Sequence, residues 1–223
     1  MDDIFYDSKF WHGPPRFIAV EGPDGAGKST LVTGLVTWMR EELGLEVEQL
    51  LEPGSGRLAS ELRAILLMGE MDISTYEEIM LMTAARVDTR LRHVQPALTT
   101  GKWVICDRAE LSTIVYQGFA RDEGAMLFAK QQQDMIRAQV RRADLYLVLQ
   151  LAYDKAQLRL LGTGKLPDRF ESADVRFRQR VSLGFELIDN LVPGEYRMAH
   201  IDASVTPEEL VQLAILAIQA ECS

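Results

Sequence analysis

The sequence is poor in cysteine and in basic residues, and it has no long apolar run. Only two of its 223 residues are cysteines, Cys106 and Cys222, and their spacing matches no metal-ligand pattern. This usage is typical of a reducing compartment, so we expect a cytoplasmic protein. No apolar stretch is long enough to cross a bilayer, which predicts no membrane partner. The net charge is −9, and so acidic a chain lacks the basic face that nucleic-acid backbones require.

Length and composition indicate one globular domain. Apolar residues make up 47% of the chain, which is enough for a full core. Residues 1–15, MDDIFYDSKFWHGPP, are acidic and aromatic, unlike a signal peptide, and we expect them to form an N-terminal extension. Residues 16–223 are expected to form a single domain. Its small lid is expected at about residues 161–171, where LGTGKLPDRFE combines glycine, proline and charges of both signs.

Apolar runs alternate with helical patterns along this domain. Short runs without a polar face are typical of parallel strands that are covered on both sides. The runs are residues 17–21, 103–106 and 145–149, with further strands expected near residues 46–51 and at Ile201. The helical patterns cover about residues 29–43, 58–67, 75–99, 111–117, 124–141, 154–161, 174–191 and 207–220. The alternation predicts an α/β fold with a doubly wound parallel sheet.

A glycine-rich segment, Gly-Pro-Asp-Gly-Ala-Gly-Lys-Ser, directly follows the first predicted strand. It meets the P-loop pattern G-x-x-x-x-G-K-S/T with Gly22, Gly27, Lys28 and Ser29. Backbone N–H groups of such a loop, with the N-terminus of the next helix, surround phosphate groups. Lys28 is expected to bridge the β- and γ-phosphates of ATP, and Ser29 to bind Mg²⁺. The predicted nucleotide-binding residues are Gly22, Pro23, Asp24, Gly25, Ala26, Gly27, Lys28, Ser29 and Thr30.

A P-loop alone does not specify a reaction, because GTPases, motor ATPases and small-molecule kinases all use one. The sequence has no guanine-reading Asn-Lys-x-Asp segment, which favours a kinase over a GTPase. The predicted strand at residues 103–106 is followed by Asp107 and Arg108. Carboxyl ends of parallel strands line the ligand crevice of such sheets. We therefore expect Asp107 to hold Mg²⁺ and Arg108 to clamp the phosphate of the acceptor.

An ordered set of segments resembles the thymidylate kinase family in its bacterial form. These segments are residues 22–29, 52–54, 84–86, 107–118, 168–171, 177–181 and 201–204. The resemblance extends from Arg16 to the C-terminus. It implies a nucleoside monophosphate kinase fold with a lid, and transfer of the γ-phosphate of ATP to dTMP with Mg²⁺, which gives dTDP. It also implies a homodimer whose other partners are small-molecule nucleotides.

The resemblance assigns roles to individual residues. Asp24 matches the acid near the acceptor sugar, Arg86 the arginine that reads the pyrimidine edge, and Arg108 the acceptor-phosphate clamp. Tyr116 matches a tyrosine that crowds the 2′ position and favours deoxyribose. The other residues implied for the acceptor site are Glu52, Met82, Ser112, Thr113 and Gln117, and those implied as catalytic cations of the lid are Lys165 and Arg169.

Three positions depart from the family pattern. Leu51 stands where an arginine normally precedes Glu-Pro-Gly, and Arg57 is a hypothetical replacement for it. Met82 stands where an aromatic side chain stacks on the base, and the lid has Gly162 and Gly164 where arginines are common. Two alternatives therefore stay open. One is a kinase for dUMP or a 5-substituted dUMP, and the other is a nucleotide-binding module without turnover.

Overall fold

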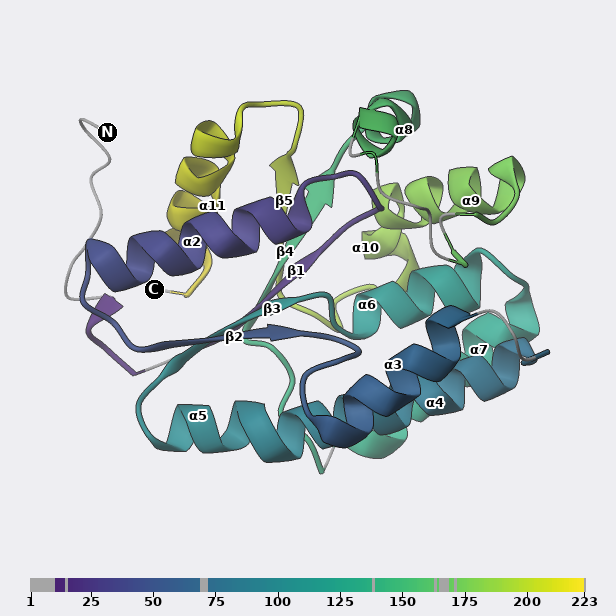
Figure 1. The fold of residues 1–223 in the computed structure, drawn as a ribbon, viewed down its shortest axis with the longest axis horizontal. Coiled ribbons are helices and arrows are strands. Elements are labelled where there is room, and N and C mark those ends of the chain that lie inside the picture. The colour runs from purple at the N-terminus through teal and green to yellow at the C-terminus, as the bar shows by residue number, and fades with distance from the viewer. Residues whose placement is uncertain are drawn as a thin grey trace.

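Five parallel strands form one sheet at the centre of the computed structural model, which describes residues 11–14, 16–68, 72–137, 139–162, 164, 169–170 and 172–222 (Figure 1). The strands are β1 (Phe17–Glu21), β2 (Val47–Leu51), β3 (Trp103–Asp107), β4 (Leu145–Gln150) and β5 (Met198–Asp202). Their order in the sheet is β2-β3-β1-β4-β5, and every neighbouring pair is parallel. β1 therefore lies in the middle, where its five residues are all buried.

Helices cover both faces of this sheet. The helical segments are α2 (Lys28–Glu41), α3 (Arg57–Met68), α4 (Thr75–Thr89), η1 (Arg90–Val94), α5 (Gln95–Thr99), α6 (Glu110–Thr113), η2 (Ile114–Phe119), α7 (Glu123–Arg137), α8 (Tyr153–Gly162), α9 (Val175–Glu186), α10 (Ile188–Leu191) and α11 (Pro207–Cys222). One core cluster joins the sheet to α2 and α11, and another joins the opposite face to η2 and α9 (Figure 1). The predicted doubly wound α/β fold is thus confirmed, because each face of the sheet is buried by helices.

Two helical regions contain wider turns than the sequence pattern predicts. The expected helix at residues 75–99 passes through the π-helical segment η1 between α4 and α5. The expected helix at residues 111–117 begins as α6 and continues as η2, which is also π-helical. π-turns are rare and often occur at functional sites. The residues of η2 include Tyr116 and Gln117, which the sequence predicts in the acceptor site.

The N-terminal segment contributes a side chain to the core. Trp11 is fully buried, and its ring centroid lies 5.2 Å from those of Trp38 and Trp103. Residues 1–10 lie outside the described residues, as does most of the expected lid. The prediction of an extension ahead of the first strand therefore misses Trp11, which packs with α2 and β3 as part of the domain core.

The carboxyl ends of β1, β2 and β3 meet at one edge of the sheet. Glu21 ends β1 before the glycine-rich loop, Leu51 ends β2 before Glu52, and Asp107 ends β3 before Arg108. Parallel strands present such residues to a common crevice. No helix in the described part of the chain is long and apolar enough to cross a membrane.

Candidate active site

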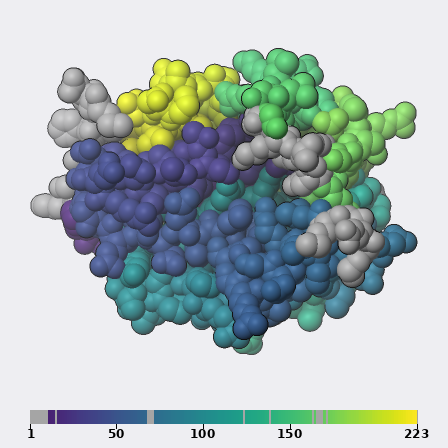
Figure 2. All heavy atoms as spheres, viewed as in Figure 1, coloured from purple at the N-terminus to yellow at the C-terminus, as the bar shows by residue number. Residues whose placement is uncertain are grey.

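A large open cleft follows the carboxyl edge of the sheet. Its volume is about 1200 Å³, more than a single small-molecule site usually needs. The lining comes from the glycine-rich loop, the ends of β2 and β3, and the helical segments α3, α4, α6, η2 and α8. In Figure 2, α2 in purple and α3 in blue flank the hollow. The cleft brings together most of the residues that the sequence predicts for the two substrates.

The glycine-rich loop adopts the conformation that its glycines allow. Gly27 has φ 95° and precedes the first residue of α2. A Cβ on Gly22, at φ +141°, would lie 2.8 Å from the carbonyl oxygen of Leu149, so a larger residue would push the loop off β4. Lys28 is buried and its Nζ donates to the carbonyl oxygen of Pro23 at 2.7 Å. Burial and the charge of Arg108 lower the pKa of Lys28 to about 8.

Ser29 and Asp107 lie in contact at the start of α2. The Ser29 hydroxyl donates to Asp107 Oδ2 at 2.5 Å, although the two residues are 78 positions apart. A hydroxyl beside a carboxylate is a donor pair that suits Mg²⁺, which prefers oxygen ligands. The described residues contain no group of three or more His, Cys, Asp or Glu that could hold a metal by themselves. The pair therefore fits an ion that also binds substrate phosphates and water.

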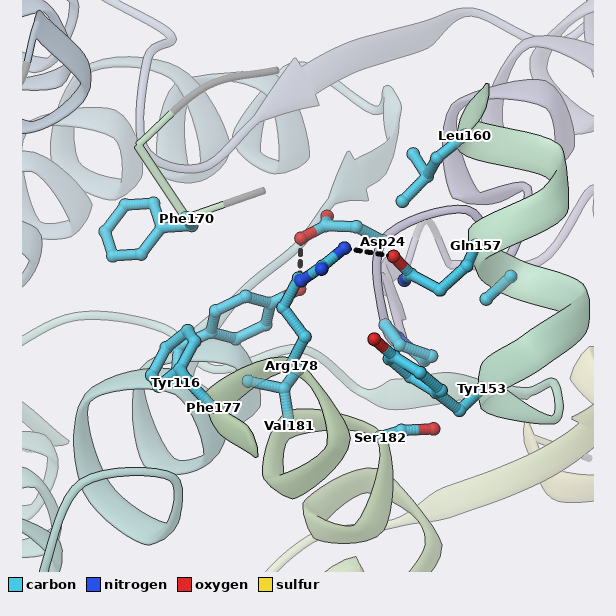
Figure 3. Close-up of a pocket in the computed structure, with 12 residues that line it drawn as sticks. Asp24, Tyr116, Tyr153, Gln157, Leu160, Phe170, Phe177, Arg178, Val181 and Ser182 are labelled. Carbon is cyan, nitrogen blue, oxygen red and sulfur yellow. Dashed lines mark hydrogen bonds between the residues drawn. The ribbon is translucent and has the colours of Figure 1, made fainter. Parts of the chain in front are cut away.

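Asp24, Arg108 and Tyr116 form a hydrogen-bonded triangle across the cleft. Arg108 Nη2 donates to Asp24 Oδ1 and, at 3.2 Å, to the Tyr116 hydroxyl. The Tyr116 hydroxyl donates to Asp24 Oδ2 at 2.7 Å (Figure 3). Burial opposes ionisation of Asp24, but Arg108, Lys28 and Tyr116 together hold its pKa below the usual value. The triangle thus presents a fixed cation and a fixed carboxylate beside the glycine-rich loop.

A small cavity lies behind this triangle, between α8 and α9 (Figure 3). Its volume is about 20 Å³, which is room for one water molecule and not for a nucleotide. Arg178 donates to Gln157 at its edge. The cavity is therefore packing space beside the cleft, and the substrates need the larger hollow.

Arg86 is held from four directions inside the cleft wall. Its Nε donates to Glu52 at 2.9 Å, Nη1 to Gln133 at 3.1 Å, and Nη2 to Thr113 at 3.0 Å. Nη2 also reaches the carbonyl oxygen of Ala109 at 3.1 Å. These bonds leave the guanidinium with one orientation, as an arginine that reads a base edge requires.

Glu52 is fully occupied by two arginines. Its Oε2 accepts from Arg86 and Arg90, and its Oε1 accepts from Arg90 at 2.9 Å. The side chain is 1% exposed. The structure therefore corrects the predicted substrate contact of Glu52, because its oxygens orient Arg86 and are already bonded.

Met82 lies one helical turn before Arg86 on α4. It is buried and lines the cleft together with Leu66 and Leu67 of α3. Gln117 lines the same hollow from η2. The structure thus places Met82 where the sequence comparison expects a stacking side chain, on the same helix face as the base-reading arginine.

The expected lid cations are not found at the phosphates. Lys165 lies outside the described residues. Arg169 does not line the cleft, and its Nη2 lies 2.6 Å from Glu78 Oε1 on α4. Glu78 is itself buried and also faces Arg121 at 3.6 Å. The structure thus corrects the catalytic role predicted for Arg169, because its charge is paired at α4.

The hypothesis that Arg57 replaces the missing arginine at Leu51 is also corrected. Arg57 is exposed at the first residue of α3 and does not line the cleft. Arg63 of the same helix does line it, beside Leu51 and Pro53. Its Nη1 donates to the carbonyl oxygen of Pro53 at 2.7 Å, which brings a positive charge to the end of β2.

Sequence reasoning missed three buried charged residues of the site. Glu21 is fully buried at the end of β1 and bonds to the segment after Arg108. Arg90 and Glu110 form an ion pair behind Arg86. The spacing of Arg86 and Arg90, four residues apart on one helix face, is the signal that could have indicated Arg90. An acid that ends an apolar strand is the weaker signal for Glu21.

Comparison with known proteins supports the resemblance seen in the sequence. Residues 20–214 match the family model for thymidylate kinase. The thymidylate kinase of Gluconobacter oxydans (strain 621H) is 36% identical over 209 residues, which cover 92% of this chain and 95% of that protein. That of Jannaschia sp. (strain CCS1) is 37% identical over 198 residues, 88% of this chain and 92% of the relative. That of Chlorobaculum parvum is 36% identical over 211 residues, 91% and 95% respectively.

Proposed function

The chain belongs to the thymidylate kinase family, and we propose that it transfers the γ-phosphate of ATP to dTMP, which gives dTDP and ADP. The observation that carries the proposal is the shared cleft. A P-loop with its Ser29–Asp107 pair faces the Asp24–Arg108–Tyr116 triangle and the buried Arg86 within one hollow. One side suits the triphosphate of a donor, and the other suits the phosphate, sugar and base of an acceptor.

The donor side is assigned to the glycine-rich loop. Its N–H groups and the N-terminus of α2 would bind the phosphates of ATP. Lys28 would leave its bond to Pro23 and bridge the β- and γ-phosphates, where its charge is most favourable. Ser29 and Asp107 would hold Mg²⁺, which when bound neutralises part of the phosphate charge.

The acceptor side is assigned to residues of α4, α6 and η2. Arg108 would clamp the acceptor phosphate, Asp24 would lie near the sugar, and Tyr116 would exclude a 2′-hydroxyl. Arg86, already oriented by Glu52, would read the edge of the base while Met82 packs on its face. The remaining neighbours proposed for the base are Ser112, Thr113 and Gln117.

Positioning and charge neutralisation suffice for this chemistry. The phosphoryl group moves between two anions, so the protein gains most by holding the acceptor oxygen in line with the donor. Arg108 and Lys28 line the same hollow, and both touch Asp24. Asp24 therefore links the donor loop to the acceptor clamp.

The comparisons lend no support to the two alternatives. The relatives named above are all called thymidylate kinase, and none suggests a kinase for another pyrimidine nucleotide or a binding module without turnover. A homodimer belongs to the same proposal. Met80 of α4 and Leu127 of α7 are 57% and 59% exposed, which is apolar surface that a second copy would cover. Sedimentation of the purified chain tests this part.

A direct assay tests the proposed reaction. The protein is incubated with ATP and Mg²⁺, and ADP release is followed with dTMP, dUMP or no acceptor. We expect release to depend on an acceptor and to be fastest with dTMP. Faster turnover of dUMP would favour the changed acceptor. ATP binding without acceptor-dependent release would contradict the kinase assignment.

A further inference from the structure

We propose that Glu21 is a positioning residue that holds Arg108 and the segment after it in the geometry needed to bind the acceptor. The inference rests on the proposed function, because it assigns a supporting role at the acceptor-phosphate clamp. Glu21 does not line the cleft and belongs to no predicted binding pattern. Its side chain acts through backbone and hydroxyl groups of residues that do line the cleft.

Both carboxylate oxygens of Glu21 point at one short stretch of chain. Oε1 accepts from the backbone N–H groups of Ala109 at 2.9 Å and Ser112 at 3.1 Å. Oε2 accepts from the Ser112 hydroxyl at 2.6 Å. Ala109 precedes α6 and offers this helix no side-chain cap of its own. Glu21 therefore supplies from another strand the acceptor that a local capping residue normally provides.

The residue held by this contact has a costly backbone conformation. Arg108 has φ 70°, the only positive φ of a residue other than glycine in the described part of the chain. A left-handed conformation costs roughly 1–2 kcal/mol for such a residue and persists only when neighbours enforce it. Here the Arg108 N–H donates to Val20 at 2.9 Å, and the next N–H, of Ala109, donates to Glu21. Two successive residues of β1 thus grip the turn.

The side chain of Arg108 is tied to the same point. Arg108 Nη1 donates to the Ser112 hydroxyl at 3.0 Å, and that hydroxyl donates onward to Glu21. The chain Arg108–Ser112–Glu21 therefore orients the guanidinium as well as its backbone. A serine hydroxyl can donate only one bond, so Glu21 decides that Ser112 offers its oxygen to Arg108.

The surroundings give the carboxylate its task. Burial raises the pKa of Glu21 to about 7, while bonds from Ser112 and the charge of Arg108 oppose that rise. A buried carboxylate without partners would be costly, and here three donors compensate it. Removal of the side chain would leave the Ala109 and Ser112 N–H groups without an acceptor. The turn would then be free to relax from the left-handed conformation, and the clamp would lose its direction.

Kinetics of three variants test the proposal. Glu21→Ala removes all three bonds, Glu21→Gln keeps the shape but not the charge, and Ser112→Ala breaks only the link to the side chain of Arg108. We expect Glu21→Ala to lower kcat/KM for dTMP roughly 10- to 100-fold, because small displacements of a clamp cost that much. The KM for ATP is expected to stay within about twofold. Glu21→Gln should restore part of the loss.

A matched control lies at the opposite end of the same strand. Asp144 Oδ2 accepts from the Phe17 N–H at 2.8 Å, which anchors the start of β1 as Glu21 anchors its end. Asp144→Asn should leave the KM for dTMP unchanged even if it lowers the melting temperature. Arg108→Ala sets the scale for complete loss of the clamp. Calorimetric titration with dTMP alone measures the same effect without turnover, and circular dichroism verifies the fold of each variant.

The outcomes separate the inference from the proposed function. If the wild type phosphorylates dTMP and both Glu21 variants keep a normal KM and kcat for it, the positioning role is overturned and the function stands. Equal losses toward ATP and dTMP would also overturn it, because they indicate a general loss of structure. If the wild type shows no turnover with any acceptor, the proposed function fails by itself.

Discussion

Lys28 illustrates how much a single buried cation depends on its neighbours. It is 6% exposed, and within the described chain it contacts the carbonyl oxygen of Pro23 and the carboxylate of Asp24. Neither contact neutralises the charge as well as a triphosphate would. The side chain is thus held in place ahead of the donor, which lowers the cost of ordering it on binding.

Lys28→Ala is expected to lower kcat by two or more orders of magnitude, as loss of a preorganised transition-state contact does. The fold should persist, because the side chain makes few packing contacts in the loop. Lys102→Ala is the control, since Lys102 stands before β3 at the other end of the sheet and pairs with exposed Glu46. Near-normal turnover of Lys28→Ala in a coupled ADP assay would refute the assignment of the phosphate loop.

Met80 and Met82 form a natural pair for testing the base pocket. Both belong to α4, but Met82 is 8% exposed and lines the cleft, whereas Met80 is 57% exposed. Met82→Ala should raise the KM for dTMP roughly tenfold, because packing on a base is worth about 1–3 kcal/mol. Met80→Ala should leave it unchanged. Equal effects of the two substitutions in steady-state assays would place the base elsewhere.

At the scale of elements, a buried ionic network joins the parts of the acceptor side. Glu110 of α6 pairs with Arg90 of η1 and accepts from the Tyr146 hydroxyl of β4 at 2.5 Å. Arg90 in turn bonds to Glu52 after β2. Burial disfavours the charge of Glu110, but Arg90, Arg86 and Tyr146 together lower its pKa to about 2. The network connects the sheet to the helices that carry Arg86.

The lowered pKa predicts how stability depends on pH. Glu110 titrates near 4.5 in the unfolded chain and near 2 in the folded one, so its stabilising effect is complete above about pH 4.5 and is lost as pH falls toward 2. Glu110→Gln should cost roughly 3 kcal/mol at pH 7 and flatten the dependence of stability on pH between 5 and 3. Urea unfolding at several pH values measures both effects.

The control for this experiment is Glu186→Gln, since Glu186 is an exposed carboxylate at the end of α9. It should leave both the stability at pH 7 and the slope with pH unchanged. A wild-type slope in Glu110→Gln would mean that the network is not the source of acid sensitivity.

At the scale of the whole molecule, one cleft serves both substrates. With a volume of about 1200 Å³, it exceeds the usual range for one ligand. The P-loop belongs to β1 and α2, whereas Arg86 belongs to α4, and the sheet edge brings the two within one hollow. Donor and acceptor should therefore bind together and stabilise the same domain.

Thermal unfolding tests simultaneous binding. At about 100 times Kd, each ligand should add roughly 2.7 kcal/mol to the stability of the folded protein. For a domain of this size, that corresponds to an increase in Tm of about 5–10 °C per ligand. The shifts from Mg²⁺ with an unreactive ATP analogue and from dTMP should add. A dTMP shift that disappears once the analogue is bound would contradict the two-sided cleft.

The sequence by itself determined the sheet and the phosphate loop. The apolar runs at residues 17–21, 103–106 and 145–149 became β1, β3 and β4, because a strand buried on both faces needs an uninterrupted apolar segment. The P-loop is contiguous, and its function depends on backbone conformations that glycines at fixed spacing allow. The Asp107–Arg108 pair was predictable for a similar reason, since the end of a parallel strand has a known place at the sheet edge.

Only the tertiary structure decided which buried charges meet. Glu21 and Ser112 are 91 positions apart, and Arg86 and Glu52 are 34 apart. No local pattern links such pairs, because their contact depends on the strand order β2-β3-β1 and on how helices return to the sheet. The same reason explains why Arg169 was predicted at the phosphates and lies beside Glu78. A charge in a sequence shows that a partner is needed, and the packing of distant elements decides which partner is close enough to desolvate and bond it.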